Sequence, residues 1–214
     1  MLSNSEPLAE GTVIMADDQF AGRGQQDNVW YAEPGKNLTI SILLKPTFLA
    51  LNKQFLLNMC ISVAINRALA KFVPAGINIK WPNDIYYNDK KIGGVLIENS
   101  ILGTGIKTTV IGIGLNVNQQ NFPADLEKSA TSLHQILQED VNLQQLLAEI
   151  CSQIESLYLQ LKAGNYTQLK ETYVNTLYRI KQKALYRQNG EIFEGEIQGV
   201  TDIGFLLVKK GQEI

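Results

Sequence analysis

The sequence predicts a mixed α/β (α+β) fold, in which helices pack on one sheet and a small β module follows. Three patterns predict this class: alternating apolar residues in the first half of the chain, a helical apolar stripe in the second half, and a hairpin turn near the end. The chain has 214 residues, enough for a domain of moderate size plus a small appendage. We place the boundary between residues 1–180 and residues 181–214.

The first half of the chain contains several short segments that read as strands. They are residues 12–15, residues 38–44, the segment with Ile77 and Ile79, and a hairpin formed by residues 94–97 and 109–113. In residues 38–44, leucine and isoleucine occupy alternate positions, which is the period of a strand with one buried face. We expect residues 12–15 to form a buried strand. Residues 20–28 are polar and contain glycines, so we expect a loop there.

Helical periodicity marks three further segments. Apolar residues from Leu56 to Ala64 recur at steps of three and four, as expected for a helix that covers a sheet. The clearest stripe runs from Leu143 to Leu161, and Asn142 with Gln145 resembles a capping box at its start. A shorter helix is predicted from Tyr166 to Leu177.

The end of the chain returns to strand patterns. Asn189 and Gly190 both accept positive φ, so they predict a hairpin turn. Alternation over residues 192–200, a turn at residues 202–204 and an apolar run at residues 205–208 complete a small β module.

Composition excludes some classes of function. The formal net charge is -2, which argues against general electrostatic binding of nucleic acid, because neutralising phosphates needs a basic excess. The first residues lack the basic start and apolar run of a secretory signal, and no apolar stretch approaches the roughly 20 residues of a membrane helix. We therefore expect a cytoplasmic protein that binds neither DNA nor a membrane.

The cysteines and the histidine carry little functional signal. Cys60 and Cys151 lie far apart, each among apolar residues at helical spacing, which favours two small buried hydrophobic side chains over a disulfide or a metal site. His134 is the only histidine, and an isolated histidine is a weak candidate for a metal ligand or a base.

Two polar segments are candidates for ligand chemistry. Gly22-Arg23-Gly24 would let a ligand approach the backbone, while the arginine offers a planar fork for phosphate or carboxylate. Residues 80–84 (KWPND) place an asparagine and an aspartate after a proline, where they can cap a turn or hold a ligand and a metal ion. Taken separately, each segment also fits an ordinary turn.

Two glycine-containing segments follow. Residues 90–98 place a lysine pair before Gly93-Gly94 and a buried strand, so a lysine there can lie over a bound anion or simply be solvated. Residues 112–118 carry glycines at alternate strand positions, which leaves one face of the sheet bare. This second segment lacks the spacing of a dinucleotide-binding fingerprint.

In this order and spacing, the segments resemble biotin–protein ligases over the chain from Gly11 onward. The strongest matches are residues 21–24, residues 80–84 followed by Lys91 and Gly94, and residues 112–118. Trp30, residues 34–38 and Ser41 are also similar to the family. The resemblance implies a core like that of class II aminoacyl-tRNA synthetases, followed by an SH3-like module from about Lys183.

The resemblance also implies roles for single residues. Lys91 would bridge the biotin carboxylate and the α-phosphate of ATP, and Arg23 would contact phosphate, so these two would be catalytic. The implied biotin-binding residues are Gln19, Gly22, Arg23, Lys91, Gly93, Gly94, Leu96, Gly112 and Gly114. The implied ATP-binding residues are Arg23, Gly24, Trp30, Asn83, Asp84, Lys91 and Asn116. Asp84 would also bind Mg²⁺.

The implied activity is that of an ATP-dependent biotin–[acetyl-CoA-carboxylase] ligase. Such enzymes convert biotin and ATP to biotinyl-5'-AMP and then transfer biotin to a lysine of a biotin carboxyl carrier domain. Members of the family often pair through their sheets, so a homodimer is one expectation. We see no helix-turn-helix before the core, and therefore do not expect the ligase–repressor form.

The sequence departs from the family pattern in two places. The Ser/Thr-Asn segment expected upstream of Gln19 has no match, because residues 3–5 lie too close to the loop; we therefore expect a truncated amino-terminal part. Gln25, Gln26 and Asp27 stand where many relatives carry a second arginine. Less positive charge there predicts a leakier adenylate, which Gln25→Arg would reduce. We also expect the β module to lack its last strand.

Two other functions stay open at this point. The departures favour a biotin- or adenylate-binding homologue without turnover, whereas Arg23, Asp84, Lys91 and Asn116 favour an active ligase. A lipoate-type ligase or octanoyl transferase shares the fold family. The combination of residues 22–24 with residues 80–84 points to biotin.

Overall fold

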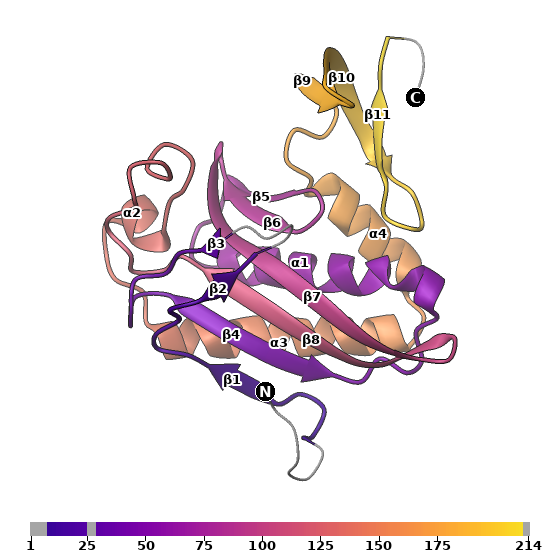
Figure 1. The fold of residues 1–214 in the computed structure, drawn as a ribbon, viewed down its shortest axis with the longest axis horizontal. Helices are drawn as coiled ribbons and strands as arrows, with labels where there is room; N and C mark the ends of the chain where they lie inside the picture. Colours follow the sequence, from indigo (N-terminus) through magenta and orange to yellow (C-terminus); the bar gives the residue numbers. More distant parts are fainter. Residues whose placement is uncertain (1–7, 25–28, 212–214) are drawn as a thin grey trace.

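A six-stranded antiparallel sheet forms the centre of the molecule (Figure 1). The computed structural model describes residues 8–24 and 29–211. Across the sheet, the strands are β1 (Val13–Met15), β4 (Leu38–Leu44), β8 (Gly105–Leu115), β7 (Lys90–Leu102), β6 (Asp84–Tyr87) and β5 (Ile77–Lys80). The mixed fold predicted from the sequence is confirmed.

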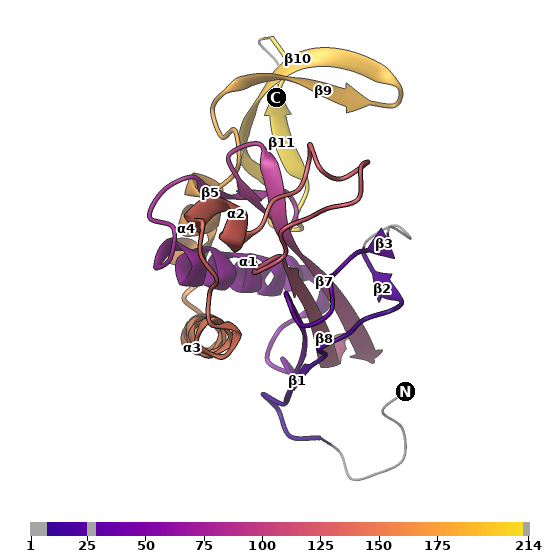
Figure 2. The same ribbon diagram turned by 90° about the vertical axis from the view of Figure 1, so that its left-hand side faces the viewer.

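Helices cover only one face of this sheet. Figure 2 shows α1 (Phe55–Ala70) and α3 (Leu143–Lys162) on one side of it, and a ribbon of β2 (Gly22–Arg23) and β3 (Val29–Trp30) on the other. α1 is buried around most of its circumference because it contacts β5 and β6, α3 and α4 (Tyr166–Asn175). Among the described residues, the opposite face of the sheet carries the β2–β3 ribbon and no helix.

Alternate side chains of β4 point to the helix-covered face and to the open face of the sheet. Leu38, Ile40, Ile42 and Leu44 are buried in the core beneath the helices. The side chains between them, Thr39 and Ser41, therefore point to the open face.

Local sequence signals set the ends of the helices. The Asn142 side chain accepts a hydrogen bond from the Gln145 backbone N–H at 2.9 Å, as the predicted cap of α3 requires. α3 stops at Lys162, and Gly164 follows with φ +85°. The next helix, α4, ends at Asn175 rather than at the predicted Leu177.

The predicted β module is present beyond the helices. β9 (Lys183–Gln188), β10 (Glu191–Val200) and β11 (Leu206–Lys209) form a three-stranded antiparallel sheet. Asn189 and Gly190 make its first turn, with φ of 52° and 87°. Figure 1 shows the module projecting from the core next to α4.

Several predictions needed correction. Residues 13–15 do form a strand, but it is a sheet edge, and Val13 and Ile14 are 37% and 44% exposed rather than buried. The predicted loop at residues 20–28 contains the start of the β2–β3 ribbon, while residues 25–28 lie outside the described residues. Residues 84–87 and the short α2 (Leu133–Leu137) were not predicted as a strand and a helix.

The cysteines and the histidine stand apart from any site. Cys60 is buried and Cys151 is half-buried, and both are free thiols; burial raises the pKa of Cys60 to about 12. His134 lies on α2, and its Nδ1 atom is 2.7 Å from Asp140 Oδ1, beyond the end of that helix. Within residues 8–24 and 29–211, no helix combines the length and the apolar character needed to cross a membrane.

Candidate active site

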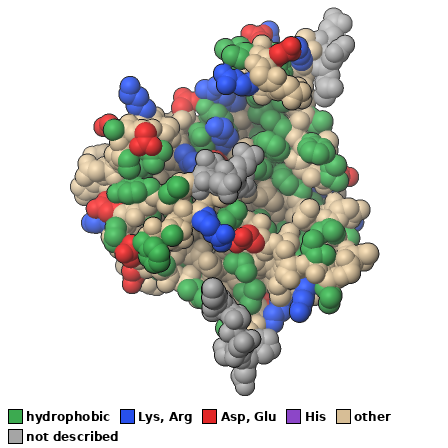
Figure 3. Space-filling model, viewed as in Figure 1, with side chains coloured by type: hydrophobic (Ala, Val, Ile, Leu, Met, Phe, Trp, Pro, Cys, Tyr) green, Lys and Arg blue, Asp and Glu red, His purple; other side chains and the backbone are tan. Residues whose placement is uncertain are grey.

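The open face of the sheet carries a cavity of about 420 Å³. Two rows of paired residues form its floor: Thr39, Gly114 and Gly94, then Ser41, Gly112 and Leu96. Three of these positions are glycine, so the floor lies close to the backbone and a flat molecule can rest on it. Figure 3 shows Lys, Arg, Asp and Glu side chains near the centre of this hollowed face.

Trp30 forms one wall of the cavity and depends on a glycine beneath it. A Cβ atom at Gly114 would lie 2.4 Å from Trp30 Cε2, so the indole can occupy its position only over a glycine. The Lys91 ammonium lies 5.9 Å from the centre of the Trp30 ring. Trp30 Nε1 is buried and has no hydrogen-bond partner among the described residues.

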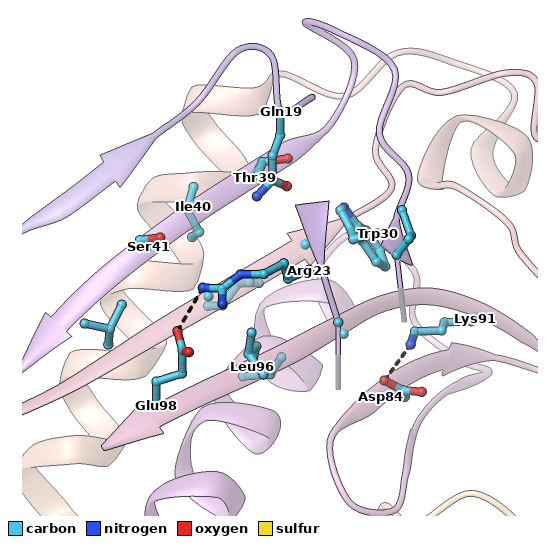
Figure 4. Close-up of a pocket in the computed structure, with 18 of the residues that line it drawn as sticks. Gln19, Arg23, Trp30, Thr39, Ile40, Ser41, Asp84, Lys91, Leu96 and Glu98 are labelled. Carbon is cyan, nitrogen blue, oxygen red and sulfur yellow. Dashed lines mark ion pairs between the residues drawn. The ribbon is translucent and has the colours of Figure 1, made fainter. Parts of the chain in front are cut away.

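Lys91 and Asp84 form an ion pair (Figure 4) beside Gly94, in the first row of the floor. Lys91 Nζ is 2.7 Å from Asp84 Oδ1, and both side chains are about one-third exposed. A Cβ atom at Gly94 would approach Asp84 Oδ1 to 3.0 Å and Lys91 Nζ to 3.3 Å. Gly94 therefore gives this ion pair the room to lie against the floor.

Arg23 enters the cavity from the β2–β3 ribbon. Its guanidinium lies 3.6 Å from the Glu98 carboxylate on β7 (Figure 4). Both side chains are more than half exposed, so this ion pair is weak and an anionic ligand can compete for the arginine. Gly22 lets the ribbon close, because a Cβ there would lie 2.4 Å from the Trp30 carbonyl oxygen.

The turn between β5 and β6 is held from the helix side. The Pro82 carbonyl oxygen accepts hydrogen bonds from Asn58 Nδ2 at 2.8 Å and from the Tyr173 hydroxyl at 2.6 Å. Burial raises the pKa of Tyr173, so this hydroxyl stays a donor. These bonds fix the turn that directly precedes Asp84, a residue of the cavity lining.

Most of the residues predicted for the site meet around this cavity. Those in its lining are Gln19, Arg23, Gly24, Trp30, Asp84, Lys91, Gly94, Leu96, Gly112 and Gly114. They come from β2, β3, β6, β7 and β8 and from the segments that flank β2, and the strand register brings most of them together. Gln25, Gln26 and Asp27 lie outside the described residues.

Four predicted residues lie outside the lining. Gly22 packs within the ribbon, and Gly93 packs against Leu115, whose Cδ1 would be 2.8 Å from an added Cβ. Asn83 is buried, donates to Asn58 Oδ1 at 2.9 Å, and borders a neighbouring pocket instead. Asn116 is 3% exposed and donates to the Thr131 carbonyl at 3.1 Å.

Asn116 nevertheless keeps one free acceptor. Its Oδ1 atom is buried without a hydrogen-bond partner among the described residues. A buried amide oxygen in this state is costly, so it is a place where a ligand donor would be favoured.

Sequence reasoning missed three polar groups of the cavity. The resemblance to the family covers Ser41 without giving it a role, and it implies no role for Thr39 or Glu98. A signal did exist, because Thr39 and Ser41 are the polar members of the alternation in residues 38–44. Glu98 faces the cavity with Leu96 and Gly94, at the same period of two along β7.

The site offers few ligands for a metal ion. Among residues 8–24 and 29–211, no group of three or more His, Cys, Asp or Glu side chains could hold a metal. Asp84 is the carboxylate nearest Lys91 in the cavity. One carboxylate suits Mg²⁺ when substrate phosphates and water provide its other ligands.

Comparison with known proteins agrees with this geometry. Residues 2–118 match the biotin/lipoate A/B protein ligase family. The chain belongs to this family. Its relatives include the bifunctional ligase/repressor BirA of Bacillus subtilis, which is 32% identical over 216 residues. That alignment covers 100% of this chain and 66% of BirA. A biotin–[acetyl-CoA-carboxylase] ligase of Paracoccus denitrificans is 25% identical, with 94% of this chain and 85% of the relative covered.

Solved structures of the ligase family share the fold. The biotin protein ligase of Aquifex aeolicus, in complex with biotin and ATP, superposes with a TM-score of 0.84 at 25% identity. The superposition covers 97% of this chain and 85% of the A. aeolicus chain. This chain therefore shares the fold of that biotin protein ligase.

Proposed function

We propose that this chain is an ATP-dependent biotin–protein ligase that makes biotinyl-5'-AMP. The observation that carries the proposal is the glycine-floored cavity with Lys91 and Arg23 at its walls. Its volume falls within the range of small-molecule sites. The A. aeolicus ligase of the same fold holds biotin and ATP, which supports the same pair of substrates here.

In the proposed first step, the biotin carboxylate attacks the α-phosphate of ATP. A C–O–P bond forms and pyrophosphate leaves, so negative charge develops on phosphate oxygens. Lys91 and Arg23 are the cations of the cavity wall and would stabilise that charge. One such donor is worth roughly 3–4 kcal/mol in a transition state.

Lys91 and Arg23 differ in how firmly their own protein holds them. Lys91 is already held by Asp84 at 2.7 Å, over the floor, so it is preorganised. Arg23 is held only by the exposed Glu98 at 3.6 Å, so phosphate can draw it away. We infer that Lys91 aligns the two substrates and that Arg23 moves onto the phosphate.

Mg²⁺ fits this scheme as a partner of the nucleotide. Asp84 would be its protein ligand, with ATP phosphates and water completing the shell. When bound, the ion would neutralise charge on the leaving pyrophosphate.

In the proposed second step, the amine of an acceptor lysine attacks the acyl carbon of biotinyl-5'-AMP and AMP leaves. The acceptor is a biotin carboxyl carrier domain of a biotin-dependent carboxylase, as the name of the P. denitrificans relative implies for that protein. Gln19 and Arg23 lie on the segment that borders the cavity, which supports a role in keeping water from the anhydride.

Location and assembly are part of the proposal. The free thiols of Cys60 and Cys151 suit a reducing compartment such as the cytoplasm. The exposed β1 edge, with Val13 and Ile14, offers a surface through which two copies could pair. Analytical ultracentrifugation of the chain and of Ile14→Lys would test that pairing.

The experiment that tests the proposal is transfer to an acceptor. The chain is incubated with ATP, Mg²⁺ and a purified biotin carboxyl carrier domain, with either biotin or lipoate. We expect a mass increase of the acceptor with biotin and none with lipoate. Modification by lipoate alone would favour the lipoate ligases of the same family, and no modification with tight biotin binding would favour a binding protein without turnover.

A further inference from the structure

Trp81 connects the cavity wall to the carboxyl-terminal module. It lies in the turn between β5 and β6, and its side chain lines the cavity together with Pro82. Its indole Nε1–H donates to the Gly204 carbonyl oxygen at 2.9 Å. Gly204 belongs to the turn of residues 201–205 between β10 and β11, so this bond joins two distant parts of the chain.

The turn of residues 201–205 fits tightly onto the core. Gly204 has φ +96°, and a Cβ atom there would lie 2.4 Å from Phe55 Cδ2, on the first turn of α1. Asp202 forms an ion pair with Lys170 of α4, and this bond lowers the pKa of the aspartate. The position of this turn is therefore set by α1 and α4 as well as by Trp81.

The helices α1 and α4 also hold the turn between β5 and β6, from the side of Pro82. The Phe55 ring packs edge-on against the Tyr173 ring, with centroids 5.8 Å apart. Tyr173 and Asn58 donate to the Pro82 carbonyl oxygen. Pro82 and its neighbour Trp81 are thus clamped between α1, α4 and the module, just before the chain reaches Asp84.

We infer that the turn of residues 201–205 positions the cavity wall for ATP, with Trp81 and Gly204 as the positioning residues. The inference rests on the proposed ligase function. It assigns the β module a part in the first half-reaction, acting through Trp81 on the segment that carries Asp84. Biotin rests mainly on the glycine floor, so its binding should depend little on this contact.

Trp81→Phe is the most conservative test. It keeps an aromatic ring but removes the N–H group that reaches Gly204. We expect the KM for ATP in biotin-dependent ATP–pyrophosphate exchange to rise about fivefold, the effect of one neutral hydrogen bond. The biotin dissociation constant, measured without nucleotide, should stay within about twofold of the wild-type value.

Gly204→Ala tests the same contact from the module side, and Gly190→Ala is its matched control. Both glycines lie in module turns with positive φ, 96° and 87°, but only Gly204 has a neighbour that an added Cβ would meet. We expect Gly204→Ala to raise the KM for ATP at least as much as Trp81→Phe, and Gly190→Ala to leave it unchanged. If both changes act through one contact, the double variant should show less than the sum of their effects.

Two outcomes of these measurements would overturn the inference. An unchanged KM for ATP in Trp81→Phe and Gly204→Ala would overturn the inference. The inference would also be overturned if the variants lost affinity for ATP and for biotin equally, in proportion to the folded fraction measured by circular dichroism. That result would indicate only a structural role.

Absence of biotin-dependent exchange in the wild-type chain would contradict the proposed function instead. Backbone amide hydrogen exchange then decides the positioning claim without any activity. Faster exchange of residues 80–84 in Gly204→Ala than in Gly190→Ala would support it, and equal exchange in the two variants would overturn it.

Discussion

Gly112 and Gly114 both belong to the cavity floor on β8, but their surroundings differ. An added Cβ at Gly114 would lie 2.4 Å from Trp30 Cε2, whereas at Gly112 the nearest atoms would be those of Leu96 at 3.7 Å. Gly114 therefore makes room for the protein's own indole. Gly112 leaves its part of the cavity floor open.

This difference predicts the behaviour of two alanine variants. Gly114→Ala should displace Trp30 and destabilise the fold by about 1–3 kcal/mol through overpacking. Gly112→Ala should change the free energy of unfolding by less than about 1 kcal/mol and lower biotin affinity by filling the floor. Tryptophan fluorescence and urea unfolding measure both effects. A Trp30 signal unchanged in Gly114→Ala would contradict the proposed packing.

Lys91 and Lys90 provide a second matched pair. Lys91 lies beside Asp84 in the cavity, whereas Lys90 points away and donates to the Glu127 carbonyl at 3.2 Å. Lys91→Ala should lower the rate of biotin-dependent pyrophosphate exchange by about 100-fold or more, the cost of losing one fixed donor. Lys90→Ala should stay near the wild-type rate. Similar rates in the two variants would remove Lys91 from its proposed role.

At the residue scale, the predicted glycines and charged residues lie in the cavity lining more often than the predicted amides do. Gly112, Gly114, Arg23 and Lys91 line the cavity, and their roles toward biotin and phosphate stay predictions. Asn83 and Asn116 do not line it. Amide side chains bond equally well to their own protein, and sequence alone does not reveal which partner they take.

The helix pair α1 and α3 gives a prediction at the scale of elements. Lys71, just after α1, pairs with Glu149 on α3 at 2.7 Å. The hydrogen bond from Lys71, followed by that from Gln153, lowers the pKa of Glu149. The stabilising contribution is therefore complete above the ordinary pKa of the carboxyl and is lost as pH falls through the lowered value.

Glu149→Gln should remove this acid-dependent contribution. Urea unfolding at pH 7 and near pH 3 should show a smaller loss of stability on acidification in the variant than in the wild-type protein. Glu155→Gln, at an exposed position on the same helix, is the control and should follow the wild-type protein. An identical pH dependence in all three proteins would rule out this role of the ion pair.

Long periodic elements were predicted well, and the elements that were missed are short. β4, α1 and α3 carry repeated apolar positions, so their pattern is visible in the sequence. β6 spans only residues 84–87, and β2 and β3 are two-residue strands. Pairing with neighbouring strands rather than local pattern defines them.

The edge strand β1 shows another limit of pattern reading. Its apolar residues suggested burial, but strand order places it at the border of the sheet. Burial of a strand depends on its neighbours in the sheet, which the local sequence does not contain.

At the scale of the whole molecule, function depends on contacts that link distant segments. The register of β4, β8 and β7 assembles the cavity floor, and the Trp81–Gly204 bond attaches the module to the cavity wall. The family resemblance predicted that these segments form one site. It did not predict the contact of the module with the turn, because no local motif marks it.

The central claim is that this cavity joins biotin to AMP, and formation of the adenylate tests it most directly. The chain would be incubated with biotin, Mg²⁺ and ATP labelled at the α-phosphate, and the products separated by chromatography. We predict labelled biotinyl-5'-AMP that requires biotin and that falls by about 100-fold or more in Lys91→Ala. No adenylate from the wild-type chain, or equal amounts from the variant, would contradict the claim.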